Sequence, residues 1–281
     1  MYLVFDIGGT KSRIAISRDC VTFDEPKIFS TPRTFKSFLE ILEKLLYKLE
    51  ANGKTKFSAG GIAGPIDRKK GSLINSPNLK SWIGEPIRES LAQMIGAPVI
   101  LENDSALVAL GEAVEGAGKG YEIVAYIASG TGLGGARIVD SKIDTARVGF
   151  EPGHQIIDFN ARKTEKCVSC DEMGHLESYV GGASVEKRFG KSPYEIEDKK
   201  IWDEIAKYLA YGLNNVSVLW SPDVIILGGS MILGSPGIEI ERVEFYLRNI
   251  MRIFPPPIIK KAELKDFGGL HGALALLRDS K

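Results

Sequence analysis

Residues 4–16 read VFDIGGTKSRIAI, which predicts a β-strand, a turn with two adjacent glycines and a second strand. A Walker-type phosphate loop or a dinucleotide fingerprint needs a helix after its glycines, so this stretch matches neither. Paired glycines let the backbone approach a ligand, and the N–H groups beside them can point at an anion. Asp6 at the mouth of the turn suits a magnesium ion held together with substrate phosphates. For this stretch alone, an ordinary glycine hairpin with a solvated aspartate remains the alternative.

A second turn of the same kind lies in mid-chain, where residues 123–139 read IVAYIASGTGLGGARIV. Gly130, Gly132 and Gly135 satisfy the pattern G-x-G-x-x-G, but a short apolar strand follows them where a Rossmann site needs a helix. Two strand–turn–strand units predict a duplicated architecture that holds a phosphate from both sides. A third turn, Gly228-Gly229-Ser230, follows an apolar strand and suits the sugar or base of a nucleotide, although glycines at strand ends are more often simple turns.

Taken in order along the chain, these motifs resemble the ROK family (repressors, open reading frames and kinases) of the actin/hexokinase superfamily. The resemblance rests on residues 6–11 (DIGGTK), Asn103-Asp104, 129–132 (SGTG), Gly228-Gly229 and 151–154 (EPGH), and it extends from Met1 to residues 268–273 (GGLHGA). It implies an α/β, two-lobed actin/hexokinase-like (ribonuclease H-like) fold with a central cleft. We expect an N-terminal lobe of residues 1–104 plus 267–281 and a C-terminal lobe of residues 105–266.

The resemblance also implies which residues hold Mg-ATP, with the magnesium ion at Asp6. The nucleotide-binding candidates all lie in the three glycine turns: Asp6, Gly8, Gly9, Thr10, Lys11, Ser129, Gly130, Thr131, Gly132, Gly228 and Gly229. ATP is the expected phosphoryl donor.

Length and composition fit a globular enzyme with two domains. The chain has 281 residues, of which 44% are hydrophobic and 26% charged. Lys+Arg and Asp+Glu both number 36, which argues against the broad basic surface that nucleic-acid binding requires. No apolar run approaches the roughly 20 residues of a membrane span, and no signal peptide is recognisable. We therefore expect a cytoplasmic protein without nucleic-acid or membrane partners. The resemblance adds a homodimer or another homo-oligomer.

Apolar periodicity predicts alternating helices and strands. We expect helices over residues 35–49, 86–95, 106–113, 201–220, 237–252 and 268–278, and strands over 57–63 and 99–101 in addition to those of the glycine turns.

Asp104 is the candidate general base. It follows a predicted buried strand, whose end would aim the carboxylate into a cleft. A sugar hydroxyl is a weak acid, and a positioned carboxylate that accepts its proton contributes about 10²–10⁴-fold to the rate. Residues 103–105 (NDS) are also good N-cap chemistry for the helix that follows, and capping and catalysis need not exclude each other.

The resemblance assigns sugar-hydroxyl contacts to Asn103, Glu151, His154 and Glu177, beside Asp104. Carboxylates and amides can each bridge two neighbouring hydroxyls, and buried polar groups of this kind give strong selectivity. Gly64 and Asn78 lie in stretches that look like the family's substrate loops, although Pro-Asn is also an ordinary turn.

The cysteines depart from the family pattern. Cys167, Cys170 and His175 form C-x₂-C-x₄-H, and together with His154 they make a chemically sound Cys₂His₂ zinc set. Such a site would let His154 bind zinc through one ring nitrogen and a sugar hydroxyl through the other. A pair of free thiols in a reducing cytosol, or a redox motif, are the alternatives. Cys20 stands apart from this group.

Two classes of function are consistent with these motifs. The first is an ATP-dependent kinase that phosphorylates a hexose at O6, with glucose as the expected acceptor and N-acetylhexosamine or fructose as alternatives. The second is a sugar-responsive regulator. Repressors of the family carry an added N-terminal helix-turn-helix domain, whereas this sequence starts at the strand of the first glycine turn. We therefore expect the kinase.

Overall fold

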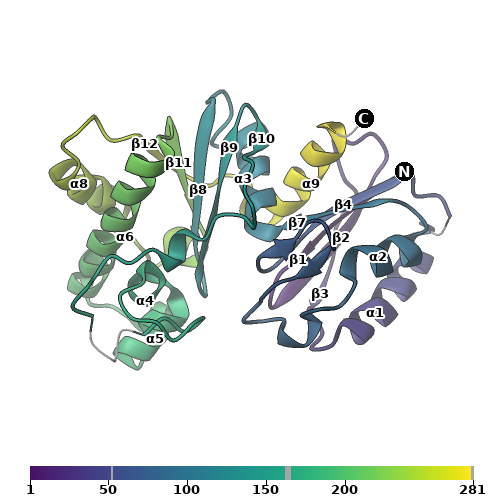
Figure 1. The fold of residues 1–281 in the computed structure, drawn as a ribbon, viewed down its shortest axis with the longest axis horizontal. Coiled ribbons are helices and arrows are strands. Elements are labelled where there is room, and N and C mark those ends of the chain that lie inside the picture. Colours follow the sequence, from purple (N-terminus) through teal and green to yellow (C-terminus); the bar gives the residue numbers. More distant parts are fainter. Residues whose placement is uncertain (52, 162–165, 280–281) are drawn as a thin grey trace. The chain divides into compact units, whose positions relative to one another are not determined.

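The computed structural model describes residues 1–51, 53–161 and 166–279, and these form two compact units (Figure 1). Unit 1 comprises Met1–Glu115, Thr145–Gly149 and Asp266–Lys281, and unit 2 comprises Gly116–Asp144 and Phe150–Lys265. Unit 1 therefore extends beyond the expected boundary at residue 104, because the helix that begins there packs on the C-terminal helix of the same unit.

Unit 1 is built on a five-stranded sheet. Its strands in spatial order are β3 (Lys27–Ser30), β2 (Lys11–Ser17), β1 (Tyr2–Ile7), β4 (Phe57–Ile62) and β7 (Val99–Asn103). Strand β1 pairs antiparallel with β2, while β1, β4 and β7 run parallel. The carboxyl ends of these three strands therefore meet at one edge, which is where α/β sheets bind ligands.

Helices cover both faces of this sheet. The side chains of Leu3, Phe5 and Ile7 on β1 pack with α1 (Phe35–Lys48) and α2 (Ile87–Ile95). On the other face, α3 (Asp104–Val114) and α9 (Gly268–Asp279) pack against each other and against β4. The smaller elements are β5 (Ile66–Asp67), β6 (Ser72–Leu73), η1 (Lys80–Trp82) and, before α9, η5 (Lys265–Phe267).

Unit 2 repeats the same sheet. Its strands in spatial order are β10 (Lys142–Ile143), β9 (Leu133–Val139), β8 (Ile123–Ser129), β11 (Val224–Gly228) and β12 (Ile258–Lys261). The central strand pairs antiparallel with the next strand in sequence and parallel with the later one, as in unit 1. The predicted duplication is therefore confirmed.

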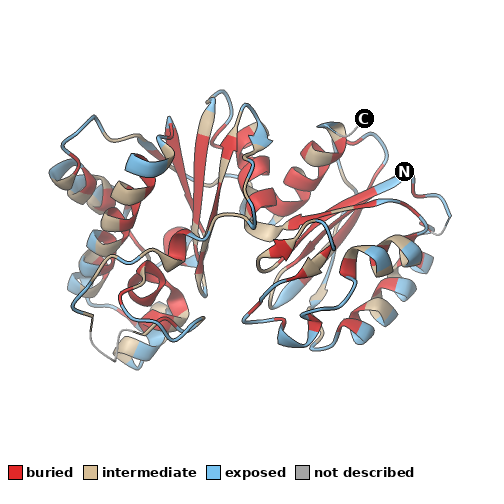
Figure 2. Cartoon of the chain, viewed as in Figure 1, coloured by how far each residue is buried: buried red, intermediate tan, exposed pale blue. Residues whose placement is uncertain are grey.

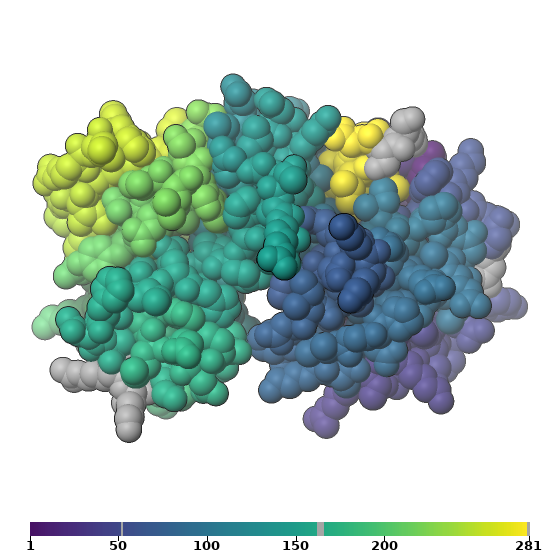
Figure 3. Space-filling view, viewed as in Figure 1, coloured from purple at the N-terminus to yellow at the C-terminus, as the bar shows by residue number. Residues whose placement is uncertain are grey.

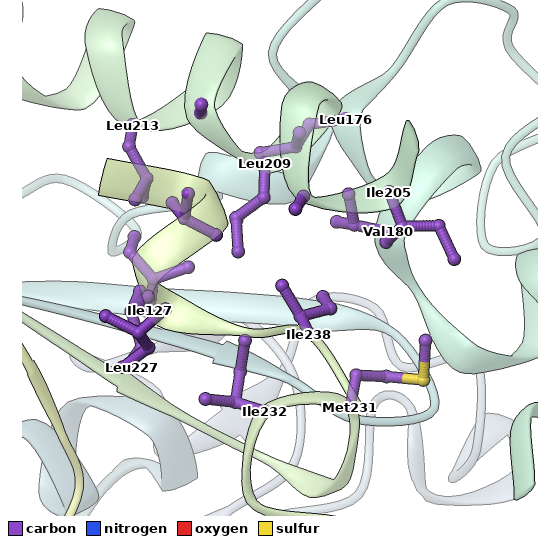
Figure 4. Packing of buried hydrophobic residues seen from close by; sticks show 14 of the residues in the cluster. Ile127, Leu176, Val180, Ile205, Leu209, Leu213, Leu227, Met231, Ile232 and Ile238 are labelled. Atoms are coloured by element: carbon purple, nitrogen blue, oxygen red, sulfur yellow. The ribbon is translucent and has the colours of Figure 1, made fainter. Parts of the chain in front are cut away.

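The helices of unit 2 enclose a large apolar core. Those that lie in the described part of the unit are η2 (Pro152–His154), α4 (Leu176–Val180), α5 (Gly182–Phe189), η4 (Pro193–Glu195), α6 (Lys199–Trp220), α7 (Ser230–Leu233) and α8 (Ile240–Ile250). Figure 4 shows Leu209 and Leu213 of α6 above Ile127 and Leu227 of the sheet, with Leu176 and Val180 of α4 beside them.

The central strands β1, β4, β8 and β11 are mostly buried, whereas the edge strands β3, β10 and β12 are largely exposed or half-buried (Figure 2). In contrast, α8 is amphipathic: it packs on α6 and leaves charged side chains on the surface, in yellow-green in Figure 3. Among the described residues, no helix has the length and apolar character of a membrane span.

The predicted elements agree with the structure apart from their limits and a few short pieces. Helix α3 begins two positions before the predicted start, because Asn103 caps it, and α8 is shorter than predicted at both ends. Apolar periodicity did not indicate β3, β12, α4 and α5, which are short and lack a clear apolar period.

Candidate functional site

The first glycine turn connects β1 to β2, as predicted. The N–H of Gly8 donates to the carbonyl of Lys11 (3.0 Å), and Thr10 and Lys11 are exposed. A side chain at Gly9 would collide with Asn78, since an added Cβ would lie 2.5 Å from the Asn78 Cβ. Gly9 therefore accommodates Asn78, one of the two predicted substrate-loop residues, against the turn.

Asp6 is buried at the carboxyl end of β1, only 8% exposed. Its carboxylate accepts a hydrogen bond from Arg13 Nη1 (3.3 Å), the residue opposite it on β2. An added Cβ at Gly269 would lie 3.0 Å from the Asp6 Cγ, so the absence of a side chain there lets the first turn of α9 approach the carboxylate. Burial, followed by the nearby charge of Asp104, raises the Asp6 pKa to about 7, although Arg13 opposes the shift.

Asp104 is the first residue of α3, directly after β7. Asn103 is the N-cap: its Oδ1 accepts from the Ala106 N–H (3.0 Å). Asn103 rather than Asp104 therefore caps the helix, and Asp104 Oδ1 accepts from the N–H (2.7 Å) and the hydroxyl (3.5 Å) of the adjacent Ser105. Desolvation raises the Asp104 pKa even though the residue keeps some solvent exposure, and the bonds from Ser105 oppose this shift.

The second predicted substrate-loop residue of unit 1, Gly64, lies beside the cap. Its carbonyl accepts from Asn103 Nδ2 (3.0 Å). Its φ of 122° falls in the region that favours glycine, and an added Cβ would lie 2.5 Å from the Asn75 carbonyl. Asn103 therefore connects the start of α3 to the Gly64 loop.

The second glycine turn joins β8 to β9, and residues 129–133 are called the second phosphate turn below. The Gly130 N–H donates to the Gly132 carbonyl (3.0 Å). Ser129 is buried and donates to the Val180 carbonyl (2.7 Å), whereas Thr131 is exposed. Open space surrounds the Cβ direction of Gly130.

The third glycine turn packs directly on the second. Gly229 has φ 86°, and an added Cβ there would lie 2.2 Å from the Ser129 carbonyl oxygen. A cavity of about 180 Å³ opens beside both turns. Its lining includes Gly130, Thr131, Ala183, Glu186, Tyr194 and Met231. No motif in the sequence indicated the last four, which come from the three elements α5, η4 and α7.

Residues 151–154 (EPGH) lie against the start of β9. An added Cβ at Gly153 would lie 2.4 Å from the Leu133 carbonyl oxygen, so only glycine permits this approach. Glu151 is exposed, and His154 is partly exposed. This packing places the predicted sugar-binding element next to the second phosphate turn.

The structure brings His154, Cys167, Cys170 and His175 together, called the Cys/His cluster below. One ligand atom from each lies within 4.8 Å of the others. The two histidine Nδ1 atoms are 3.3 Å apart, and the Cys170 Sγ lies 3.3 Å from His175 Nδ1 and 3.6 Å from His154 Nδ1. Donor atoms around a tetrahedral zinc ion are about 3.3–3.8 Å apart, so the residues fit this metal.

The partial burial of the Cys/His cluster shifts the pKa values of Cys167, Cys170 and His175 in the direction that favours their neutral forms. Desolvation raises the pKa of both thiols and lowers the pKa of His175. Because Nδ1 of His154 faces the thiols, its Nε2 is the nitrogen left for another partner. Cys20 is buried in unit 1, apart from this cluster.

Glu177 is 5% exposed, and both of its carboxylate oxygens accept hydrogen bonds from protein groups. Oε2 accepts from the Leu133 N–H (2.7 Å), while Oε1 accepts from Ser169 Oγ (2.5 Å) and the Cys167 thiol (3.2 Å). A carboxylate offers about four acceptor positions, so its predicted contact with a sugar hydroxyl stays a prediction.

Three supporting residues were not predicted. Arg13 holds Asp6, and Ser169 holds Glu177. Arg68 forms a forked ion pair with Glu102 (2.8 Å), one residue before Asn103, and so stabilises the end of β7. Only Arg13 had a signal in the sequence, since it alternates with apolar residues on the strand paired with Asp6.

A comparison with known families decides the assignment, because the ROK family model matches residues 2–280. The chain belongs to the ROK family. It is 29% identical to an N-acetyl-D-glucosamine kinase of Mannheimia succiniciproducens over 97% of both chains. It is 28% identical to an N-acetyl-D-glucosamine kinase of Escherichia coli O127:H6, over 98% of this chain and 99% of that protein.

Solved ROK structures share the fold. A ROK hexokinase from Thermus thermophilus has a TM-score of 0.82 at 24% identity, over 100% of this chain and 99% of the other. A ROK family glucokinase from Streptomyces griseus, in complex with glucose and AMPPNP, has a TM-score of 0.79 at 24% identity over 99% of both chains. The predicted family and the actin/hexokinase-like fold class are confirmed.

Proposed function

We propose that this protein is an ATP-dependent sugar kinase that phosphorylates a hexose at O6. The observation that carries the proposal is the pair of carboxylates, Asp6 and Asp104, at the carboxyl ends of two parallel strands of one sheet, β1 and β7. Both have raised pKa values, which is typical of groups that handle protons or metal-bound phosphates.

Asp104 is assigned as the general base. Its Oδ1 accepts from Ser105, so Oδ2 is the oxygen assigned to the sugar hydroxyl. The proton moves from the hydroxyl to Oδ2 as the sugar oxygen bonds to the γ-phosphorus and the bond to the ADP oxygen breaks. Placement of the two reactants contributes on the order of 7–11 kcal/mol and proton removal roughly 3–5 kcal/mol, so positioning is the larger effect.

The nucleotide is assigned to the glycine turns. Thr10 and Lys11 of the first turn and Thr131 of the second phosphate turn are exposed, and the backbone of such glycine turns suits phosphate oxygens. The cavity beside Tyr194 and Met231 suits the base. The Asp6 carboxylate is the candidate ligand of a magnesium ion, directly or through its waters. When bound, that ion would neutralise charge on the transferred phosphate.

Sugar hydroxyls are assigned to Asn103, Glu151, the Nε2 of His154 and Glu177, with Gly64 and Asn78 as loop contacts. The Cys/His cluster is the candidate zinc site, with His154, Cys167, Cys170 and His175 as ligands. When bound, zinc would fix the His154 ring and the segment around Cys167.

Glucose is the proposed acceptor. N-acetylglucosamine is the second candidate, because relatives of this chain that span its length are N-acetyl-D-glucosamine kinases.

The test is ADP release, coupled to a chromogenic assay, with Mg-ATP and a panel of glucose, mannose, fructose, N-acetylglucosamine and N-acetylmannosamine. We expect sugar-dependent ADP release with glucose among the best substrates by kcat/KM. A strong preference for an N-acetylated sugar, with negligible use of glucose, would refute the acceptor and keep the kinase. No sugar-dependent ADP release from any of the five would refute the kinase.

A further inference from the structure

We propose that Glu177 is a positioning residue for the nucleotide: it holds the second phosphate turn and links that turn to the segment that carries the Cys/His cluster. The inference rests on the proposed function and adds a role to the sugar contact assigned to Glu177. All the residues that carry it belong to unit 2.

The hydrogen bond between Glu177 and the turn is short and buried. Oε2 accepts from the Leu133 N–H at 2.7 Å, at the point where the turn enters β9. A hydrogen bond to a charged acceptor in a buried place is stronger than one between neutral groups. Leu133 is therefore held at its backbone as well as through its side chain, which is buried in the apolar core.

Packing against Glu177 requires a glycine at position 132, which the glycine motif alone does not reveal. An added Cβ there would lie 2.5 Å from Glu177 Oε2. The space that a side chain would occupy is filled by the carboxylate. Gly132 thus serves the contact with Glu177, whereas the open space at Gly130 leaves that glycine free to face a ligand.

The end of α4 and the start of α5 are joined to the same turn by backbone and side-chain hydrogen bonds. Besides the bond from Ser129 to Val180, the Gly182 N–H donates to the Gly130 carbonyl (2.8 Å), and the Ala183 N–H donates to the Thr131 carbonyl (2.9 Å). The turn and the junction of α4 with α5 therefore behave as one hydrogen-bonded piece.

The apolar core fixes α4 from its other side. Leu176 and Val180 lie in the core with Ile205 and Leu209 of α6 (Figure 4). Gly212 of α6 leaves room for Leu176, since an added Cβ would lie 2.2 Å from the Leu176 Cδ2. Because α4 is anchored in this way, Glu177 presents its carboxylate in a defined position.

The second oxygen of Glu177 connects to the Cys/His cluster. Oε1 accepts from the Ser169 hydroxyl and from the Cys167 thiol, and His175 is the N-cap position of α4. A change in the Cys167–Cys170 segment therefore acts on the carboxylate that holds the phosphate turn. Nucleotide binding should respond to this segment even though none of its residues is assigned a contact with the nucleotide.

Titration calorimetry of Mg-ADP binding without sugar tests the inference, because a residue that serves the sugar alone leaves this affinity unchanged. Glu177→Ala should weaken Mg-ADP binding at least about tenfold, and Ser169→Ala about threefold. Glu177→Gln keeps an acceptor oxygen for the Leu133 N–H, so it should retain more affinity than Glu177→Ala.

Ser178→Ala is the matched control for Ser169→Ala. It makes the same chemical change next to Glu177, and among the described residues the Ser178 hydroxyl has no hydrogen-bond partner. We expect Mg-ADP affinity within about twofold of wild type.

Amide hydrogen exchange at Leu133 provides a readout that needs no ligand. Exchange should be faster in Glu177→Ala and Ser169→Ala than in wild type and in Ser178→Ala, because the Leu133 N–H loses or loosens its acceptor. Unchanged Leu133 exchange in Glu177→Ala and Ser169→Ala overturns the inference, and so does an unchanged Mg-ADP affinity of these two variants together with a raised sugar KM. A wild-type protein that binds no Mg-ADP rejects the proposed function instead.

Discussion

The two glycine turns have the same backbone plan and different sources of negative charge. Each connects the central strand of its sheet to the antiparallel neighbour, and each has a glycine that makes room for a polar side chain from elsewhere, Asn78 at Gly9 and Glu177 at Gly132. In the first turn the carboxylate, Asp6, belongs to the strand itself. In the second the strand ends in the neutral Ser129, and the carboxylate comes from α4.

This difference suggests that the carboxylate of the first turn takes part in the reaction, whereas the carboxylate beside the second turn positions the backbone. Asp6 is close enough to Asp104 for their charges to interact within unit 1, and Asp6 has a raised pKa of about 7. Glu177 has its oxygens engaged by protein donors. We therefore expect substitutions at the edge of the first sheet to impair both the reaction and the use of Mg-ATP, and substitutions around the second turn to impair nucleotide binding without removing a reacting group.

The largest effect is expected for Asp104→Asn. The amide keeps the shape of the side chain and cannot accept the hydroxyl proton, so kcat should fall by at least about 10²-fold while sugar affinity changes much less. Steady-state kinetics with separate kcat and KM values provide the measurement. Asp24→Asn, at an exposed carboxylate of unit 1, is the control. Near-normal kcat in a folded Asp104→Asn protein would assign the base to another residue.

The next largest effect is expected for the KM for Mg-ATP, which allows a direct comparison of one substitution in each turn. Asp6→Asn removes the charge that would organise magnesium and phosphates, so the KM for Mg-ATP should rise by about tenfold or more. Ser129→Ala removes one neutral hydrogen bond to Val180 and should raise this KM only about threefold. Equal effects of the two substitutions would remove the distinction between the turns.

A smaller effect is expected for the pH dependence of folding stability. The folded-state pKa of Asp6, about 7, exceeds the ordinary value of 3.8, so the folded protein holds this proton more tightly than the unfolded chain. As pH rises from about 4 to about 7, the ligand-free protein therefore loses stability at this position, by at most about 4 kcal/mol. Asp6→Asn should avoid this loss, and its Tm should exceed that of wild type more at pH 8 than at pH 4. A Tm difference that does not grow with pH would contradict the raised pKa.

The sequence predicted what is local in the chain. Asp6, Asp104 and the glycines of both turns lie at the ends of apolar strands, so hydrophobic periodicity placed them. The packing of Asn78 on Gly9 and of Glu177 on Gly132 joins residues that lie far apart in sequence, and no spacing rule links them. Ser169 in the Cys167–Cys170 loop likewise has no local reason to contact Glu177, since the carboxylate is placed by the core under α4.

The smallest expected effect is that of the Cys/His cluster on sugar binding. Cys170→Ser replaces one of four candidate zinc ligands with a poorer one, so bound zinc should be lost and the sugar KM should rise several-fold. Global unfolding is not expected, because the apolar cores of both units lie outside this loop. Cys20→Ser changes a buried thiol of unit 1 and should leave zinc content and kinetics near wild type. Elemental analysis of protein purified without chelator decides the point: less than about a tenth of a zinc ion per chain in wild type would mean that the two thiols hold no structural metal.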